Sequence, residues 1–300
     1  MTSRILITGA SGLIGTDLAP ALRALGNEVT GWDLRTGQDV RADLDLHGFD
    51  GIVHLAAISR VAEAEADPEA CWATNVGGTG NVLRAAMKSR PWVLFASSRE
   101  VYGQPAQLPV DEDSPLRPLN IYGRAKVRGE QLVAESGLTA VVVRLSNVYG
   151  RVTDHGDRVV PAFARAAAEA RGLRVDGRDN GFDFVHIDDA TAGLLSVIEV
   201  LTAGESSPPL HLVTGRETSL GALAELAVEL GAGEIVDAPP RGYDVSRFCG
   251  VPTRARQRLG WVAKVAMREG MTQLVSDFQA GRQAPTAVGG ERGAPGSRHP

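Results

Sequence analysis

The chain has 300 residues, of which 43% are apolar and 22% are charged, a composition typical of globular proteins with a packed core. Its net charge of −5 gives no electrostatic reason to expect binding to nucleic acid or to an anionic membrane. No apolar run approaches the roughly 20 residues needed to span a bilayer, and a strand predicted from residue 4 leaves no room for a signal peptide. We therefore expect a cytoplasmic protein that binds neither nucleic acid nor a membrane.

The two cysteines, Cys71 and Cys249, form no Cys-x-x-Cys pair and have no clustered histidine partner. This pattern argues against a zinc site or a disulfide framework, so no metal is expected.

The first half of the chain alternates strands with helices. Strands are predicted at residues 4–8, 28–32, 51–55, 92–96 and 139–145, and helices at 13–25, 68–88 and 121–135. Strands that read as continuous apolar runs and are separated by helices indicate a parallel sheet covered on both faces. Right-handed crossovers then predict an α/β fold with a doubly wound sheet.

The second half is less regular. Helices are predicted at residues 159–171, 188–202, 219–230 and about 265–280, with a short strand at 210–213. We expect residues 1–150, with about 182–203, to form the first domain. Residues 151–181 and 204–280 would form a smaller C-terminal lobe. Residues 281–300, rich in Gly, Pro and Arg, have almost nothing to bury and are expected to be a disordered tail.

Three glycines, Gly9, Gly12 and Gly15, follow the first predicted strand and open the first helix. Gly9 permits a tight turn, Gly12 lets the backbone approach a pyrophosphate, and Gly15 lets the helix pack close to the sheet. The pyrophosphate would lie at the helix N-terminus, where free N–H groups and the helix dipole favour an anion. The pattern predicts a dinucleotide-binding (Rossmann) domain.

Asp33 ends the second predicted strand, 18 residues after Gly15. A carboxylate there accepts hydrogen bonds from the adenosine ribose and repels a 2′-phosphate, which favours NAD over NADP. Arg35 lies close and can soften that preference. Asp43 and Leu44 are expected as adenine contacts.

Tyr122 and Lys126 are four residues apart on a predicted helix, so their side chains share one face. A nearby ammonium favours the phenolate and is expected to lower the tyrosine pKa. Lysine is scarce, since it occurs only at positions 88, 126 and 264. Ser97 and Ser98 end a predicted strand, and doubly wound sheets place their sites at strand C-termini. The sequence therefore predicts a catalytic Tyr–Lys–Ser site.

Several ordered motifs make the chain resemble the extended short-chain dehydrogenases/reductases, specifically the NAD-dependent sugar-nucleotide epimerase/dehydratase family. They are TGASGLIG at 8–15, HLAA at 54–57, NVGGT at 75–79, SSREVYG at 97–103, Tyr122 with Lys126, RLSNVYG at 144–150, DFVHIDD at 183–189, RGYD at 241–244 and RARQRLGW at 254–261. Together they cover about residues 4–280.

The resemblance implies a role for each matching residue. Tyr122 would take the proton from a sugar hydroxyl while hydride leaves for NAD, Lys126 would also hold the nicotinamide ribose, and Ser98 would bind the reacting oxygen. Asn147 and Arg241 would contact the diphosphate or nucleoside, with Arg99 beside the sugar and Glu100 as a further catalytic candidate. The cofactor would be bound by Gly9, Ser11, Gly12, Leu13, Ile14, Gly15, Asp33, Asp43, Leu44, Leu55, Ala56, Ala57, Asn75, Ser97, Tyr122 and Lys126.

Two departures from the family pattern bear on the reaction. Sugar 4,6-dehydratases of the family carry Thr-Asp-Glu where this chain has Ser98, Arg99 and Glu100. The Asp supplies the acid that expels water, and an arginine with a pKa above about 12 cannot donate that proton. Many relatives also place a diphosphate-binding Arg where this chain has Phe182; Arg178, Arg151 or Arg158 are candidates to compensate.

These features favour a nucleotide-sugar 4-epimerase that works through a transient 4-keto sugar, with a homodimer expected from the resemblance. Three alternatives stay open: a 4-ketoreductase of the same fold, a decarboxylase of a nucleotide-linked uronic acid, and a regulatory protein that binds the dinucleotide without turnover. Regulatory proteins of this kind commonly lose the Tyr or the Lys, and both are present here.

Overall fold

The computed structural model describes residues 2–240 and 245–283, so Arg241 and residues 284–300 of the expected tail lie outside the described residues. The last helix runs to Gln283, three residues into the stretch expected to be disordered. Within the described ranges, no helix combines the length and the apolar character needed to cross a membrane.

Six parallel strands form the main sheet in the order β2-β1-β3-β4-β5-β9. They are β1 (Arg4–Thr8), β2 (Glu28–Trp32), β3 (Gly51–His54), β4 (Trp92–Ser98), β5 (Ala140–Leu145) and β9 (Leu210–Leu212). After β1 the chain goes to one side for β2 and to the other for β3, so the strand order reverses between β1 and β3. Ligands of doubly wound sheets bind at such a point, outside the carboxyl ends of the strands.

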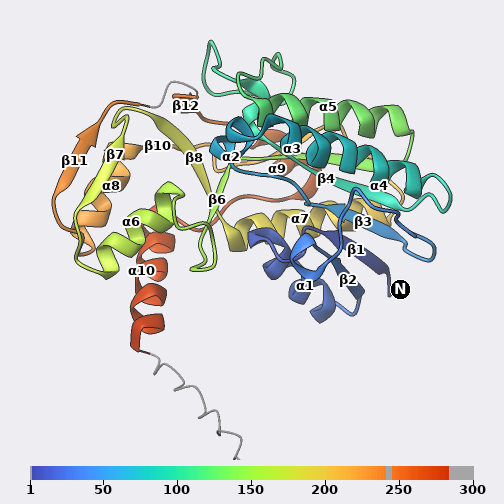
Figure 1. Ribbon diagram of the computed structural model, residues 1–300, viewed down its shortest axis with the longest axis horizontal. Coiled ribbons are helices and arrows are strands. Elements are labelled where there is room, and N and C mark those ends of the chain that lie inside the picture. The colour runs from blue at the N-terminus through green and yellow to red at the C-terminus, as the bar shows by residue number, and fades with distance from the viewer. Residues whose placement is uncertain (1, 241–244, 284–300) are drawn as a thin grey trace, which may run out of the picture.

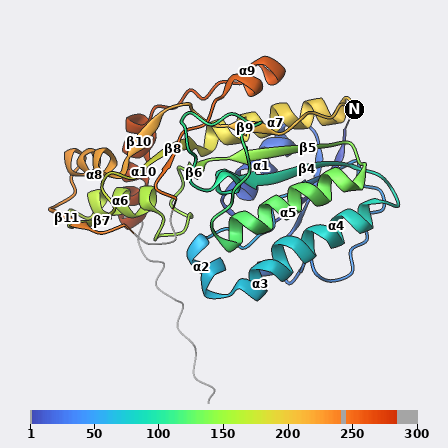
Figure 2. The same ribbon diagram turned by 90° about the horizontal axis from the view of Figure 1, so that it is seen from above.

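Helices cover both faces of this sheet (Figure 2). On one face α1 (Leu13–Ala24) packs against α7 (Ile187–Thr202), and on the other α4 (Thr79–Ala86) packs against α5 (Ile121–Ser136). Successive residues of a strand serve opposite faces. Ile5 and Ile7 join the core cluster on the α1 and α7 side, whereas Leu6 joins the cluster of α4 and α5. The predicted doubly wound α/β sheet is confirmed.

The single helix predicted over 68–88 is instead divided. A short α2 (Val61–Ala66) precedes α3 (Pro68–Trp72), which passes through a π-helical segment, η2 (Ala73–Gly78), into α4. Asp67 caps α3 by accepting from Ala70 N at 2.9 Å. The hydrophobic periodicity of the sequence does not reveal the π-helical turn of η2. Turns of this kind are often found beside functional sites.

A smaller lobe lies at the end of the molecule that carries β7, β11, α6 and α8 (Figure 1). Its mixed sheet contains β6 (Asn147–Tyr149), β8 (Gly181–His186), β10 (Glu217–Ser219) and β12 (Arg247–Phe248), and β7 (Leu173–Asp176) pairs with β11 (Ile235–Ala238). The helices are α6 (Val159–Ala168), α8 (Leu220–Glu229) and α10 (Met267–Gln283), while α9 (Thr253–Leu259) contacts α7 and β9. Phe163, Leu223 and Met271 belong to the lobe's core.

The sheets divide the chain differently from the expected boundaries. β9, expected in the lobe, pairs with β5 at the edge of the main sheet. β8, expected in the main domain, pairs with β6, β10 and β12 in the lobe. The sequence of a short apolar strand does not show which strand it pairs with, so β8 and β9 were assigned to the wrong sheets. We propose that β9 belongs to the main domain and β8 to the smaller lobe.

Candidate active site

A cleft of about 770 Å³ runs along the carboxyl edge of the main sheet and continues against the lobe. Residues that follow β1, β2, β3, β4 and β5 line it, together with residues of α5, α6 and the lobe sheet. The predicted site residues that line it are Gly9, Gly12, Leu13, Ile14, Gly15, Asp33, Leu55, Ala56, Ala57, Ser97, Ser98, Arg99, Glu100, Tyr122, Lys126 and Asn147. One cleft therefore brings together groups predicted for the cofactor and groups predicted for the substrate.

The glycine loop has the close backbone contacts that a dinucleotide cradle needs. Gly9 has φ +71°, and a Cβ there would lie 2.7 Å from Ala56 N. A Cβ on Gly15 would lie 2.6 Å from Ala10 O. Gly12 is the N-cap of α1 with no side-chain cap, so the helix N-terminus is open to an anion. These residues fit the pyrophosphate of a dinucleotide.

Asp33 ties the end of β2 to the glycine loop. Its carboxylate accepts from Ser11 N at 2.9 Å and from Arg35 N at 2.9 Å, while the Arg35 guanidinium donates to Ser11 O at 2.8 Å. Ser11 thus supports the loop through its backbone and does not line the cleft. The fixed carboxylate lies at the cleft wall, where an adenosine ribose would meet it.

The remaining cofactor predictions lie outside the cleft wall. Asp43 is exposed and Leu44 packs against the core, and the cleft is lined there by Asp39, Val40 and Arg41 instead. The sequence shows a crowd of acidic residues in this loop but not which of them faces inward.

Asn75 and His54 order the loops around the cleft. Asn75 is buried. Its Oδ1 accepts a hydrogen bond from Ile58 N at 2.8 Å, and its Nδ2 donates one to Ile58 O at 3.0 Å. His54 bridges the hydroxyls of Thr8 at 2.7 Å and Thr79 at 2.9 Å. Burial lowers the pKa of His54 to about 3, so the ring is neutral and serves as a structural link.

The helix that carries Tyr122 and Lys126 begins where Asn120 caps α5 by accepting from Gly123 N at 2.7 Å. Tyr122 therefore lies in the first turn and Lys126 one turn later, on the same face. Lys126 Nζ donates to Ala96 O at 2.7 Å and lies 5.8 Å from the centroid of the Tyr122 ring. The side chain of Ser98 hydrogen-bonds the Tyr122 phenol. The predicted triad is assembled at one point of the cleft.

The protonation states differ from the sequence-based expectation. Burial raises the pKa of Tyr122 to about 12, and the hydrogen bond from Ser98 opposes that rise only in part. Burial also lowers the pKa of Lys126 to about 8. The expected lowering of the tyrosine pKa by the ammonium is thus wrong for the protein alone, because desolvation of the buried phenol dominates.

Arg99 and Glu100 form a nearly buried ion pair at the substrate end of the cleft. Arg99 Nη2 lies 2.8 Å from Glu100 Oε1, and Asn120 Nδ2 donates to the other carboxylate oxygen at 2.7 Å. Arg99 Nε donates to Asn147 Oδ1 at 3.1 Å. Both oxygens of Glu100 are therefore engaged by donors inside the protein, which leaves it poorly placed to move protons.

Two links across the cleft were not anticipated from the sequence. Arg60, in the loop after β3, pairs with Asp157 in the loop before α6. Arg158 from the same loop donates to Ser59 Oγ at 3.2 Å. We call these four residues the cleft strap. Contacts between residues about 100 positions apart leave no local signal in a single sequence.

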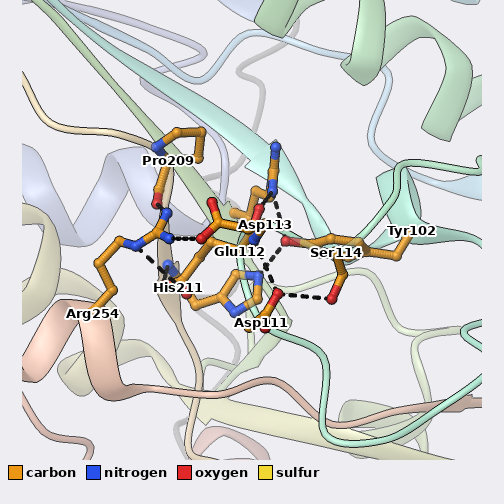
Figure 3. A network of polar contacts seen from close by, with 9 residues as sticks. Tyr102, Asp111, Glu112, Asp113, Ser114, Pro209, His211 and Arg254 are labelled. Atoms are coloured by element: carbon orange, nitrogen blue, oxygen red, sulfur yellow. Dashed lines mark hydrogen bonds and ion pairs between the residues drawn. The ribbon is translucent and has the colours of Figure 1, made fainter.

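Behind the site, a polar network fastens the segment after β4 to β9 (Figure 3). The Tyr102 hydroxyl lies 2.6 Å from His211 Nε2, and Glu112 Oε1 accepts from His211 N at 3.1 Å. Arg254 pairs with Asp113 at 2.5 Å and donates to Pro209 O at 3.0 Å. The network ties the segment after β4 to the edge strand of the main sheet and to α9. Among the described residues, no cluster of His, Cys, Asp or Glu suited to a metal is found, and both cysteines are free and buried.

The glycine loop lies where the strand order of the sheet reverses, and Tyr122, Lys126 and Ser98 line the same cleft. This arrangement defines a dinucleotide-dependent oxidoreductase of the short-chain type. The family model described as the NAD dependent epimerase/dehydratase family matches residues 5–210. The chain belongs to this family, which confirms the resemblance seen in the sequence, and NAD is its cofactor.

Similar proteins of known activity differ in the reaction they catalyse. A UDP-glucose 4-epimerase of Streptomyces lividans is 31% identical over 87% of this chain and 92% of its own. A GDP-6-deoxy-D-mannose reductase of Pseudomonas aeruginosa is 29% identical over 93% and 98%. UDP-glucuronic acid decarboxylase 1 of Arabidopsis thaliana is 28% identical over 92% and 70%.

Solved structures agree with this placement. The UDP-glucose 4-epimerase of Thermotoga maritima, solved with UDP-glucose, has a TM-score of 0.87 at 27% identity and covers 93% of this chain and 100% of its own. MoeE5 in complex with UDP-glucose and NAD has a TM-score of 0.86 at 26% identity, with the same coverage. The fold and the enzyme class are therefore shared across several reactions.

Proposed function

We propose that this enzyme is a nucleotide-sugar 4-epimerase that uses NAD catalytically and returns it unchanged. The cleft strap is the observation that favours an epimerase over the other reactions. Arg60, Asp157, Arg158 and Ser59 join two loops that line the cleft. A dinucleotide under such links would be retained from one turnover to the next. Retention suits an enzyme that regenerates its cofactor within each cycle.

The chain's own residues supply the acid–base chemistry. Ser98 holds the 4-oxygen of the sugar, and Tyr122 accepts the proton of that hydroxyl as the C4 hydride leaves. NAD, when bound, accepts the hydride and gives it back. The Lys126 ammonium beside the phenol favours the phenolate during transfer, once substrate and coenzyme exclude water. After the 4-keto sugar presents its other face, Tyr122 returns the proton, so no atom is gained or lost.

The Arg99–Glu100 pair argues against elimination of water from the sugar. Arg99 stands where dehydratases of the family carry their acid, and a guanidinium cannot take over the role of a carboxylic acid as proton donor. Glu100 is engaged by Arg99 and Asn120 on both oxygens. The same engagement weakens the decarboxylase alternative, because it leaves no free carboxylate beside Ser98.

A 4-ketoreductase is the second candidate, favoured by the similarity to the GDP-6-deoxy-D-mannose reductase over nearly the whole chain. A reductase consumes a reduced coenzyme in each cycle and must release it. The two functions therefore differ in whether the purified enzyme keeps its coenzyme.

The test is incubation of purified enzyme with a panel of UDP- and dTDP-hexoses, without added coenzyme, in D₂O. An epimerase interconverts a C4 pair and places no deuterium at C4, because the hydride returns from NAD. Mass spectrometry of the small molecules released by denaturation should detect NAD at close to one equivalent per chain. Turnover that occurs only with a 4-keto sugar and stoichiometric reduced coenzyme would establish the reductase instead.

We also propose a homodimer formed through the face of α4 and α5. Trp72 at the end of α3 and Met87 after α4 are large apolar side chains that are 45% and 44% exposed, and a second chain packed on this face would cover them. Light scattering at micromolar concentration should give twice the chain mass, and Trp72→Glu should give a monomer. Two unpaired thiols suit a reducing compartment, so we propose the cytoplasm as the location.

A further inference from the structure

The guanidinium of Arg99 is held in a fixed plane at the substrate end of the cleft. Its carbon lies 4.5 Å above the centroid of the Phe182 ring, a stacked cation–π geometry. Its Nη2 pairs with Glu100 and its Nε donates to Asn147 Oδ1. The side chain is only 11% exposed. Three contacts thus fix the group before any ligand arrives.

One donor of this guanidinium is left over. Arg99 Nη1 is buried and has no hydrogen-bond partner, and it is the one arginine nitrogen in that condition among residues 2–240 and 245–283. A buried donor of a charged group without a partner is costly, so an acceptor is expected to meet it. Arg99 lines the cleft directly after Ser98, so the nearest source of an acceptor is a ligand that reaches the substrate end and draws the buried Nη1 toward it.

Two other arginines near the cleft already bind partners within the protein. Arg158 is held by Asp154 and Ser59 in the strap, and Arg151 pairs with Asp17 and Asp188. Neither has a buried nitrogen without a partner.

Arg178 lies further away. It pairs with Glu225 at 2.5 Å and Asp237 at 3.3 Å on the lobe and does not line the cleft. The three arginines considered from the sequence as substitutes for a charge at position 182 are therefore worse placed than Arg99, which lies directly on the Phe182 ring.

We propose that Arg99 is the anion-binding residue of the substrate half of the cleft, and that Phe182 is the platform that presents it. The inference rests on the proposed nucleotide-sugar activity. The anionic oxygen comes either from the diphosphate or from a carboxylate on the sugar, since both offer the planar or forked acceptors that a guanidinium prefers. Because the Asn147 amide oxygen accepts from Arg99 Nε, the Asn147 NH₂ is left as a second donor in the cleft lining.

The experiment titrates the NAD-loaded protein with UDP, UDP-glucose and UDP-glucuronate by calorimetry. The main variant is Arg99→Lys, because it keeps a cation for Glu100 while removing the fork that supplies Nε and Nη1. We expect binding to weaken about 10- to 100-fold. Equal weakening for all three ligands assigns the anion to the diphosphate, and weakening for UDP-glucuronate alone assigns it to a sugar carboxylate.

Two further variants separate recognition from folding. Arg178→Lys replaces an arginine outside the cleft and should leave all three affinities unchanged. In Arg99→Gln, Phe182→Arg, a guanidinium is supplied from the other side of the stack, and diphosphate binding should recover relative to Arg99→Gln alone.

The outcomes distinguish the inference from the proposed function. If wild-type protein binds none of the three ligands, the nucleotide-sugar activity itself is wrong. If wild-type protein binds them and Arg99→Lys, with an unchanged thermal midpoint, binds them equally well, the role of Arg99 is refuted.

Discussion

Glu130 and Arg144 form a doubly hydrogen-bonded ion pair near the carboxyl edge of the main sheet, with Oε2–Nη2 at 2.6 Å and Oε1–Nε at 2.9 Å. Their side chains are 9% and 5% exposed. Ser97 donates to the same carboxylate at 2.5 Å, and Arg144 Nη1 donates to the Tyr102 hydroxyl at 2.7 Å. The pair therefore joins α5, β4, β5 and the network of Figure 3 behind the triad.

Glu130→Gln should destabilise the fold strongly. The change leaves the Arg144 charge buried without its counterion, a loss of about 3–5 kcal/mol in the free energy of unfolding. Chemical denaturation followed by circular dichroism measures it. Glu135→Gln, on the same helix, removes an exposed partner of Arg128 and should leave the midpoint unchanged. Equal midpoints for the two variants would show that the buried pair contributes little.

Tyr122→Phe should abolish turnover while preserving the fold and coenzyme binding. The phenol is the proposed proton carrier, so its loss should lower kcat by about 10²- to 10⁴-fold. The ring still packs with Ala64, Cys71 and Ala125, so the thermal midpoint should change little. Coenzyme content and turnover are measured on the same preparation. Unaltered activity would favour a role without catalysis by this residue.

Local chemistry made much of this molecule predictable. Three patterns depend only on nearby residues or on the end of a strand: the spacing of the glycines, the position of Asp33, and the spacing of Tyr122 and Lys126. The residues of all three patterns line the cleft. The cleft strap and the Arg99–Phe182 stack depend on loops distant in sequence, which local patterns do not specify. The raised pKa of Tyr122 was missed for the same reason, since the extent of burial is a property of the packed structure.

The stability of the protein should fall as the pH is lowered below about 6.5, because of its buried neutral histidines. Burial lowers the pKa of His54 and of His211 to about 3, below the unfolded value of about 6.5. Between these values the unfolded chain binds more protons, so stability is lost with falling pH, by up to about 1.4 kcal/mol per pH unit for each ring. Urea unfolding from pH 7 to pH 4 measures the slope.

His54→Gln should flatten that slope by about one proton, although it also weakens the bridge between Thr8 and Thr79. His54→Asn, which also removes the ring, serves as a second variant and should flatten the slope by the same amount. If His54→Gln has the wild-type slope, the ring is not kept neutral by burial.

Opening the cleft strap should speed the loss of coenzyme. Asp157→Asn removes the charge that pairs with Arg60 across the cleft, and the contact of Arg158 with Ser59 then remains alone. Because partly exposed ion pairs are weak, we expect a several-fold faster release of NAD rather than its complete loss. Bound NAD is followed by mass spectrometry of the protein fraction at intervals after dilution into a coenzyme scavenger, with Glu135→Gln as the surface control. If Asp157→Asn releases NAD at the wild-type rate, the strap does not retain the coenzyme, and the main argument for epimerase over reductase fails.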